Sequence, residues 1–135
     1  MASGHLKLGS MGEQAARAFL KKKGYRILER NWRCVRGEID LICSRKGTLV
    51  FVEVKTRSED GLVHPRDLLI PQKQARMTAA AKLYLTRTKG WNRPCRFDLV
   101  TVVWKDSGDP TIEHVRDAFA IGGSSGCLNS PWQPW

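Results

Sequence analysis

The chain has 135 residues, of which 41% are hydrophobic, enough for the core of one compact domain. Lys and Arg outnumber Asp and Glu by 23 to 13, which gives a formal net charge of +10. A surplus of this size attracts a polyanion, so nucleic acid is the expected partner, and a merely basic surface is the simpler alternative. No stretch is apolar and long enough to span a membrane, which argues against a membrane protein.

The start of the chain and its cysteines favour a cytoplasmic protein. Met1 to Ser10 lacks the apolar core of a secretory signal. Residues 1–9 are expected to be an N-terminal tail, part of which could derive from an expression vector. The four cysteines contain no CxxC pair and the three histidines have no metal-ligand spacing, which disfavours a zinc site. We therefore expect reduced cysteines that act as small core residues.

The first predicted element is a helix from about Met11 to Lys23. Ser10 and Glu13 have the spacing of a capping box, in which each side chain bonds to the backbone of the other residue. Apolar residues then recur at helical spacing up to Gly24, a residue that suits a helix end. The capping box gives Glu13 a structural explanation that competes with any role in a site.

Three strands are predicted next. Residues 25–33 and residues 38–44 have strand-like patterns, and short glycine-containing turns separate the strands. Thr48 to Thr56 is the strongest strand of the chain, because it is rich in β-branched residues and alternates regularly. Its two faces are formed by Val50, Val52 and Val54 on one side and by Leu49, Phe51, Glu53 and Lys55 on the other.

A loop, a helix and one or two strands complete the prediction. Arg57 to Ile70 has no sustained period and is expected to be a loop. Pro71 suits the first turn of a second helix that stops before Gly90. Cys95 to Lys105 is typical of an inner strand, and Thr111 to Val115 could add a short edge strand. The side of the second helix expected to pack carries Ala75, Ala79, Ala80, Leu83 and Tyr84.

These elements predict a single α/β domain at residues 10–119 with the element order αβββαβ(β). Residues 120–135 are rich in Gly, Ser, Pro and Trp. This composition builds little core, so the segment is expected to be a C-terminal tail.

An acid and a base lie two residues apart on the strongest strand, at Glu53 and Lys55, and project from the same face. Burying either charge costs free energy unless the charge is paired or binds a cation. In isolation, such a pair is more often a solvated surface ion pair. The preceding strand favours a site instead, because a short turn joins the two strands and lets Asp40 lie beside Glu53.

Two carboxylates that converge at the end of a sheet repel one another. A hard divalent cation such as Mg²⁺ relieves this repulsion by taking oxygen ligands. A nearby ammonium can orient or deprotonate an attacking water and offset charge that builds up on a phosphate. Asp40, Glu53 and Lys55 together with a bound metal therefore suit hydrolysis of a phosphodiester.

Four runs of sequence resemble the YraN-like proteins. They are Gly12-Glu13, residues 36–42 (RGEIDLI), residues 50–57 (VFVEVKTR) and residues 93–98 (RPCRFD). That family is regarded as similar to archaeal Holliday-junction resolvases within the PD-(D/E)xK nuclease superfamily. The resemblance covers the chain from Gly9 to Phe119. It implies a restriction-endonuclease-like fold, a mixed sheet flanked by helices, with Mg²⁺ or Mn²⁺ at the acidic site.

By motif, the resemblance places Asp40 at the superfamily's metal-binding aspartate and places Glu53 and Lys55 at its ExK pair. Glu13 matches the first-helix glutamate of the resolvase-like branch and is the fourth candidate for the catalytic set. Ile39 stands where the superfamily's name has a proline.

The resulting hypothesis is a metal-dependent endonuclease acting on DNA, with branched or junction DNA in repair or recombination as a candidate substrate. Asp40, Glu53 and the Val54 carbonyl would hold the metal, and Lys55 would position the water. Symmetric cutting of a junction needs two active sites, so a homodimer is expected in that case. The alternatives are a nucleic-acid-binding module without catalysis and a carboxylate-pair glycosidase, which leaves Lys55 unexplained.

The segment from Pro71 to Phe97 is a candidate phosphate-binding surface, because it holds seven basic residues and no acidic one. Lys and Arg bind phosphates largely without regard to sequence, although a solvated helix face would look the same. The preferred nucleic-acid contacts are Arg57, Lys73, Gln74 and Arg76. Asp98, on an inner strand, is expected to pair with Arg96 or another base and not to act in catalysis.

Overall fold

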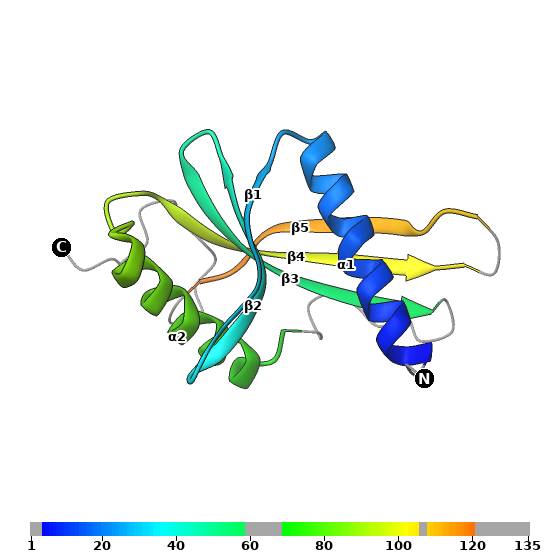
Figure 1. Cartoon of the computed structure of the whole chain (residues 1–135), viewed down its shortest axis with the longest axis horizontal. Helices are drawn as coiled ribbons and strands as arrows, with labels where there is room; N and C mark the ends of the chain where they lie inside the picture. Colours follow the sequence, from blue (N-terminus) through cyan, green and yellow to red (C-terminus); the bar gives the residue numbers. More distant parts are fainter. Residues whose placement is uncertain (1–3, 59–68, 106–107, 121–135) are drawn as a thin grey trace.

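Two helices lie on opposite faces of a five-stranded mixed sheet in the computed structural model of the chain (Figure 1). The structure describes residues 4–58, 69–105 and 108–120, with side chains from Gly9 onward. The elements are α1 (Gly4–Lys22), β1 (Arg26–Cys34), β2 (Gly37–Arg45), β3 (Thr48–Ser58), α2 (Pro71–Thr88), β4 (Cys95–Trp104) and β5 (Thr111–Phe119). The order αβββαββ confirms the predicted class and is compatible with a restriction-endonuclease-like fold.

The strands lie in the sheet in chain order, β1-β2-β3-β4-β5. Neighbouring strands are antiparallel except for β3 and β4, which are parallel because α2 forms the crossover between them. Positive φ angles at Lys46 (49°) and Gly47 (83°) make the tight turn from β2 to β3. The parallel pair in the centre is covered on both faces, as parallel strands usually are.

Alternation along β3 divides the core into two clusters. Leu49 and Phe51 belong to the cluster that α2 covers, and Val50 and Val52 belong to the cluster that α1 covers. This division confirms the predicted faces. Glu53 continues the row of Leu49 and Phe51, so the sheet carries a buried acid on the side that α2 covers.

Helix α1 begins at Gly4, earlier than predicted, and the predicted capping box is wrong. Ser10 lies inside the helix, where its side chain cannot cap the first turn. The residues before Ser10 contain no proline, so nothing stops the helical hydrogen bonding from continuing upstream. Glu13 instead accepts a hydrogen bond from Asn31 Nδ2 at 3.1 Å.

Helix α2 begins with Pro71 in its first turn, as predicted, and its packed face agrees with the predicted one only in part, at Ala80 and Tyr84. Its buried residues are Met77, Ala80, Ala81, Tyr84 and Leu85. Ala75 of the predicted face is exposed, because burying the larger Met77 and Leu85 removes more apolar surface from water. Within the described ranges, no helix is long and apolar enough to cross a membrane.

Strands β3 and β5 extend further along the chain than predicted. Arg57, expected to start a loop, belongs to β3, and residues 59–68 of that loop lie outside the described residues. The short edge strand is the full-length β5, which continues to Phe119. Residues 1–3 of the predicted N-terminal tail and residues 121–135 of the predicted C-terminal tail also lie outside the described residues.

Three of the cysteines lie in or beside the core, as expected of small core residues. Cys43 is a buried free thiol and Cys34 is a half-buried one, and Cys95 is buried as well. Burial raises the pKa of Cys43 to about 12, so this side chain stays a thiol. Cys127 lies outside the described residues.

Gly12 lets α1 approach β3 closely. A Cβ at this position would lie 2.9 Å from the Cβ of Thr56 and even closer to its hydroxyl oxygen. We expect Gly12→Ala to lower the free energy of unfolding by about 1–3 kcal/mol, because buried Ala16 holds the helix in place. Gly9→Ala is the matched control on the same helix: a Cβ there meets nothing within 4 Å. It should stabilise the helix by up to about 1 kcal/mol.

Urea unfolding of both variants measures the difference. A Gly12→Ala protein as stable as Gly9→Ala would show that α1 has room to move away from β3.

Candidate active site

Asp40 and Glu53 meet where β2 and β3 separate. Backbone pairing of the two strands ends at Leu41 and Val52, one residue before the acids. There the Asp40 carboxylate replaces a backbone acceptor: its Oδ2 takes a hydrogen bond from the Val54 N–H at 2.8 Å. The fork between the strands thus holds an acidic side chain from each of them.

Glu53 is a buried carboxylate between two lysines. Its side chain is 3% exposed, and its Oε2 lies 3.5 Å from Lys55 Nζ and 3.2 Å from Lys73 Nζ. Among the described residues, no hydrogen-bond donor reaches its other oxygen, Oε1. A buried polar atom without a partner is uncommon, because desolvating it costs free energy that nothing returns. Oε1 is therefore an oxygen that can accept a ligand.

The charge on Asp40 is unfavourable at this position. Burial and the neighbouring Glu53 carboxylate raise the pKa of Asp40 from 3.8 to about 7, although the hydrogen bond from Val54 and the charge of Lys73 oppose the shift. A proton on one of the two carboxyl groups relieves their repulsion. A divalent cation between the two groups would relieve the same repulsion.

The donor set fits a hard cation that keeps much of its water. Mg²⁺ commonly uses one or two carboxylates and several waters. Asp40 and Glu53 supply the carboxylates. The N–H and C=O of a strand residue point to the same side, so the Val54 carbonyl faces the fork as its N–H does. In the described part of the chain, no group of three or more His, Cys, Asp or Glu could hold a metal.

A cavity of about 300 Å³ opens beside Asp40. It is lined by Gly9, Glu13, Asp40, Val54, Lys55, Thr56 and Arg57. Three elements therefore contribute to one hollow: α1, β2 and β3. The Lys55 side chain is 35% exposed, so its ammonium is both near Glu53 and accessible from the cavity. The site is open to a ligand that Lys55 can contact.

Glu13 lies on the wall of this cavity, but it is not part of a three-acid cluster. Its carboxylate accepts the hydrogen bond from Asn31 instead. The structure thus brings Glu13 into the neighbourhood of Asp40 without joining it to the two carboxylates in the fork.

The profile of the uncharacterised protein family UPF0102 matches residues 12–102, about two thirds of the chain. The chain belongs to this family. UPF0102 proteins of Nitratidesulfovibrio vulgaris and Lawsonia intracellularis are 45% and 43% identical to it over 127 and 129 residues. These matches cover 94% of both chains in the first case, and 96% of this chain and 97% of the relative in the second. The suspected relationship to the YraN-like proteins is thereby confirmed.

The region that matches UPF0102 contains both acids of the fork and both lysines beside Glu53. Lys73 was predicted as a nucleic-acid contact, and its place next to Glu53 was missed. The chain order contains no clear signal for it, because residues 59–70 separate the end of β3 from the start of α2. Lys73, in the first turn of α2, reaches back to the buried carboxylate.

The other predicted nucleic-acid contacts lie in different surroundings. Gln74 Nε2 donates to the Leu69 carbonyl at 2.6 Å, which ties the start of α2 to the residues before it. Arg76 is exposed on α2, whereas Arg57 lines the cavity beside Asp40. Their role in binding nucleic acid stays a prediction.

A second charged cluster is buried on the side of the sheet that α1 covers. Arg96 Nε donates to Asp98 Oδ1 at 3.0 Å, the Asp117 N–H donates to the same oxygen at 2.9 Å, and His114 Nε2 lies 2.7 Å from Oδ2. Arg96 also donates to the Tyr25 hydroxyl. Burial raises the pKa of Asp98, but hydrogen bonds from His114 and Arg96 outweigh it and hold the pKa below its usual value. The predicted pairing of Asp98 with Arg96 is confirmed.

The raised pKa of Asp40 predicts how stability depends on pH when divalent cations are absent. The folded protein holds this proton more tightly than the unfolded chain does, so the contribution is complete below about pH 4 and is lost as the pH rises towards 7. Asp40→Asn removes the charge and keeps an acceptor for the Val54 N–H. It should exceed the wild type in stability by on the order of 4 kcal/mol near pH 8 and by little near pH 4.

Urea unfolding in EDTA at the two pH values measures this difference. Equal stability of the two proteins near pH 8 would mean that the carboxylates in the fork do not repel.

Proposed function

We propose that this UPF0102 protein is a metal-dependent nuclease that hydrolyses phosphodiester bonds in DNA. One observation carries the proposal: among the described residues, Glu53 is buried with an unpartnered Oε1 beside Asp40, whose pKa is raised and which lines a cavity together with Lys55. Two acids placed together in this way destabilise the fold unless a cation joins them. A cation bound between Asp40 and Glu53 would remove this cost.

Each residue of the site has a distinct task in this reaction. Asp40, Glu53 and the Val54 carbonyl would hold Mg²⁺ or Mn²⁺, which supplies a Lewis acid for the phosphoryl oxygen and lowers the pKa of a bound water. Lys55 orients the attacking water from the cavity side and stabilises negative charge that develops on the phosphate. Lys73 stays on Glu53 and fixes the direction of that carboxylate.

The net charge of +10 and the resemblance to junction resolvases support DNA as the substrate and branched DNA as the preferred form. Cutting both strands of a junction symmetrically requires two copies of the site, so this substrate goes together with a homodimer. Sedimentation on junction DNA distinguishes the assemblies, and a species with one protein copy would argue against paired cutting.

A non-catalytic nucleic-acid-binding module is the second candidate function. Lys55 and Lys73 both approach Glu53, so they already offset its charge without a metal ion. The small number of acidic groups in the described part of the site also favours this alternative. The two functions differ in whether the fork takes up a cation.

Calorimetric titration with Mn²⁺ tests the proposal at this point. We expect the wild type to bind the ion and Asp40→Asn to bind it at least about 10-fold more weakly, because one of two carboxylate ligands loses its charge. Glu38→Gln is the control, since its carboxylate pairs with Arg33 at 3.2 Å outside the cavity. Tight DNA binding by a wild type that takes up neither Mn²⁺ nor Mg²⁺ would favour the module.

A further inference from the structure

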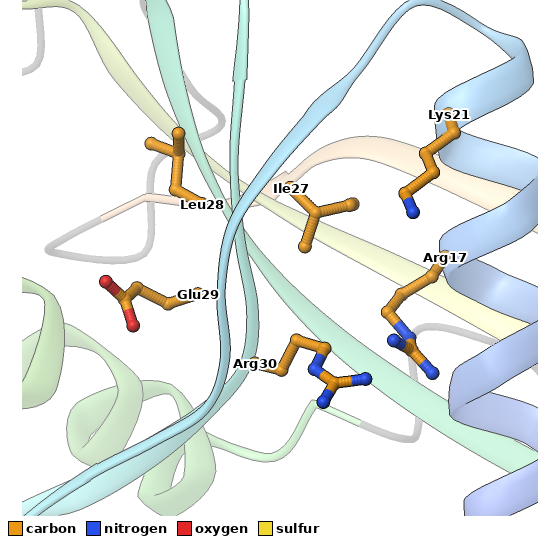
Figure 2. Close-up of a pocket in the computed structure, with 6 residues that line it drawn as sticks. All are labelled: Arg17, Lys21, Ile27, Leu28, Glu29 and Arg30. Carbon is orange, nitrogen blue, oxygen red and sulfur yellow. The ribbon is translucent and has the colours of Figure 1, made fainter.

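A second cavity, of about 510 Å³, lies between α1 and the edge strand β1. It is lined by Arg17, Lys21, Ile27, Leu28, Glu29 and Arg30. Figure 2 shows Arg17 and Lys21 extending from α1 and Arg30 extending from β1 into the space between the two elements. Glu29 points to the other side of β1 (Figure 2). Three cationic side chains therefore extend into this hollow, and the side chain of Glu29 points away from it.

An irregularity in β1 explains why Arg30 joins this group. Regular alternation would put Ile27 and Arg30 on opposite faces of the strand, because they are an odd number of residues apart. The pairing register of β1 with β2 shifts between Ile27 and Glu29, as in a β-bulge. After the shift, Ile27 and Arg30 both face α1 (Figure 2).

The cations of this hollow lack anionic partners. Arg17 Nε is buried and has no hydrogen-bond partner among the described residues. Within the same ranges, no ion pair involves Arg17, Lys21 or Arg30. Removing a guanidinium donor from water is unfavourable unless an acceptor replaces the water. A phosphate supplies such acceptors, and arginine is well suited to bind one.

The hollow and the active-site cavity lie one after the other along α1. Gly9 and Glu13 line the active-site cavity, and Arg17 and Lys21 follow them at four-residue steps on the same stripe of α1. Each step advances about 6 Å along the helix axis. On β1, Asn31 holds Glu13 and is the neighbour of Arg30. A strand that leaves the active site along α1 therefore reaches the cations within one to three turns of the helix.

We propose that the α1–β1 hollow binds backbone phosphates of the nucleic-acid strand on one side of the bond that is cut. The inference rests on the proposed function, which places the bond that is cut at the fork between β2 and β3. The nucleic-acid strand would then run along α1 and β1 and not along the predicted contacts on α2. Its side chains are suited to phosphates and carry no group that would distinguish bases, so recognition there is independent of sequence.

The test compares two double variants that remove the same charge. Arg17→Gln/Arg30→Gln changes the hollow, and Lys105→Gln/Arg116→Gln changes exposed positions outside both cavities and outside the basic segment from Pro71 to Phe97. Binding of a labelled single-stranded oligonucleotide is followed by fluorescence anisotropy in EDTA over a series of salt concentrations. We expect the first variant to bind about 10-fold or more weakly at low salt, and its salt slope to fall by roughly 1.4, the value for two lost phosphate contacts. The control should stay within about threefold of wild type with an unchanged slope.

One further variant keeps the outcome clear. Lys21→Gln changes an exposed position and should weaken binding in the same direction, so it serves if the double variant does not fold. Affinity and slope equal to those of the control would overturn the inference, as would a wild type that binds no oligonucleotide. Binding that depends on the hollow, in a protein that takes up no metal and cuts nothing, would uphold this inference and reject the nuclease.

Discussion

Lys55→Met is expected to lower the single-turnover rate of metal-dependent DNA cleavage by about 10²–10⁴-fold, the range for loss of a general acid or base. The ammonium of Lys55 reaches both Glu53 and the cavity, where the attacking water and the phosphate have to lie. Mn²⁺ uptake should change little, because Asp40 and Glu53 both remain. Rapid-quench cleavage with saturating metal and protein in excess over DNA measures the rate.

Lys73→Met is the matched control for this variant. Its ammonium also approaches Glu53, at 3.2 Å, but Lys73 is not among the residues that line the cavity. We expect a loss of at most about 10-fold, because the residue positions Glu53 and does not contact the phosphate. Equal losses in the two lysine variants would show that both lysines act through Glu53. The proposal that Lys55 orients the attacking water would then be wrong.

Asp98→Ala is expected to lower the free energy of unfolding by about 3–5 kcal/mol, among the largest effects of any single substitution in the core. The change leaves the guanidinium of Arg96, which is 8% exposed, without its carboxylate. It also removes the acceptor of the Asp117 N–H and the partner of His114. Urea unfolding near neutral pH measures the loss.

The pH dependence of Asp98→Asn provides the control for this cluster. The pKa of Asp98 is lowered in the folded state, so its stabilising contribution is present above its ordinary value of 3.8 and is lost as the pH falls through the lowered value. The wild type should therefore exceed Asp98→Asn in stability near pH 7 and lose that advantage in acid. An advantage that does not vary with pH would mean that the carboxylate charge contributes nothing.

The pairing of Asp40 with Glu53 could be predicted because it depends on local rules. A tight turn at Lys46 and Gly47 fixes the register of two consecutive strands, and alternation then decides which side chains share a face. The partnership of Asp98 with Arg96 was accessible for the same reason, since the two residues are two apart on one strand. Such contacts need no knowledge of how helices pack.

The remaining contacts depend on tertiary packing. Lys73 reaches Glu53 only because α2 crosses over the sheet, and His114 reaches Asp98 from a different strand. The hollow at Arg17 and Arg30 requires both the position of α1 and the irregularity in β1. None of these features leaves a period in the sequence, so the sequence pattern predicted Lys73 only as a nucleic-acid contact and did not indicate the hollow.

The central claim is that the fork between β2 and β3 cuts phosphodiester bonds with the help of a metal ion. The most direct test is cleavage of labelled junction, flap, single-stranded and duplex DNA with Mg²⁺ or Mn²⁺ by the wild type and by Asp40→Asn. The account predicts metal-dependent cutting by the wild type, strongest on branched DNA, and a loss of at least about 100-fold in the variant with little change in DNA affinity. Equal cutting by the two proteins, or binding without cutting by the wild type under either metal, would contradict it.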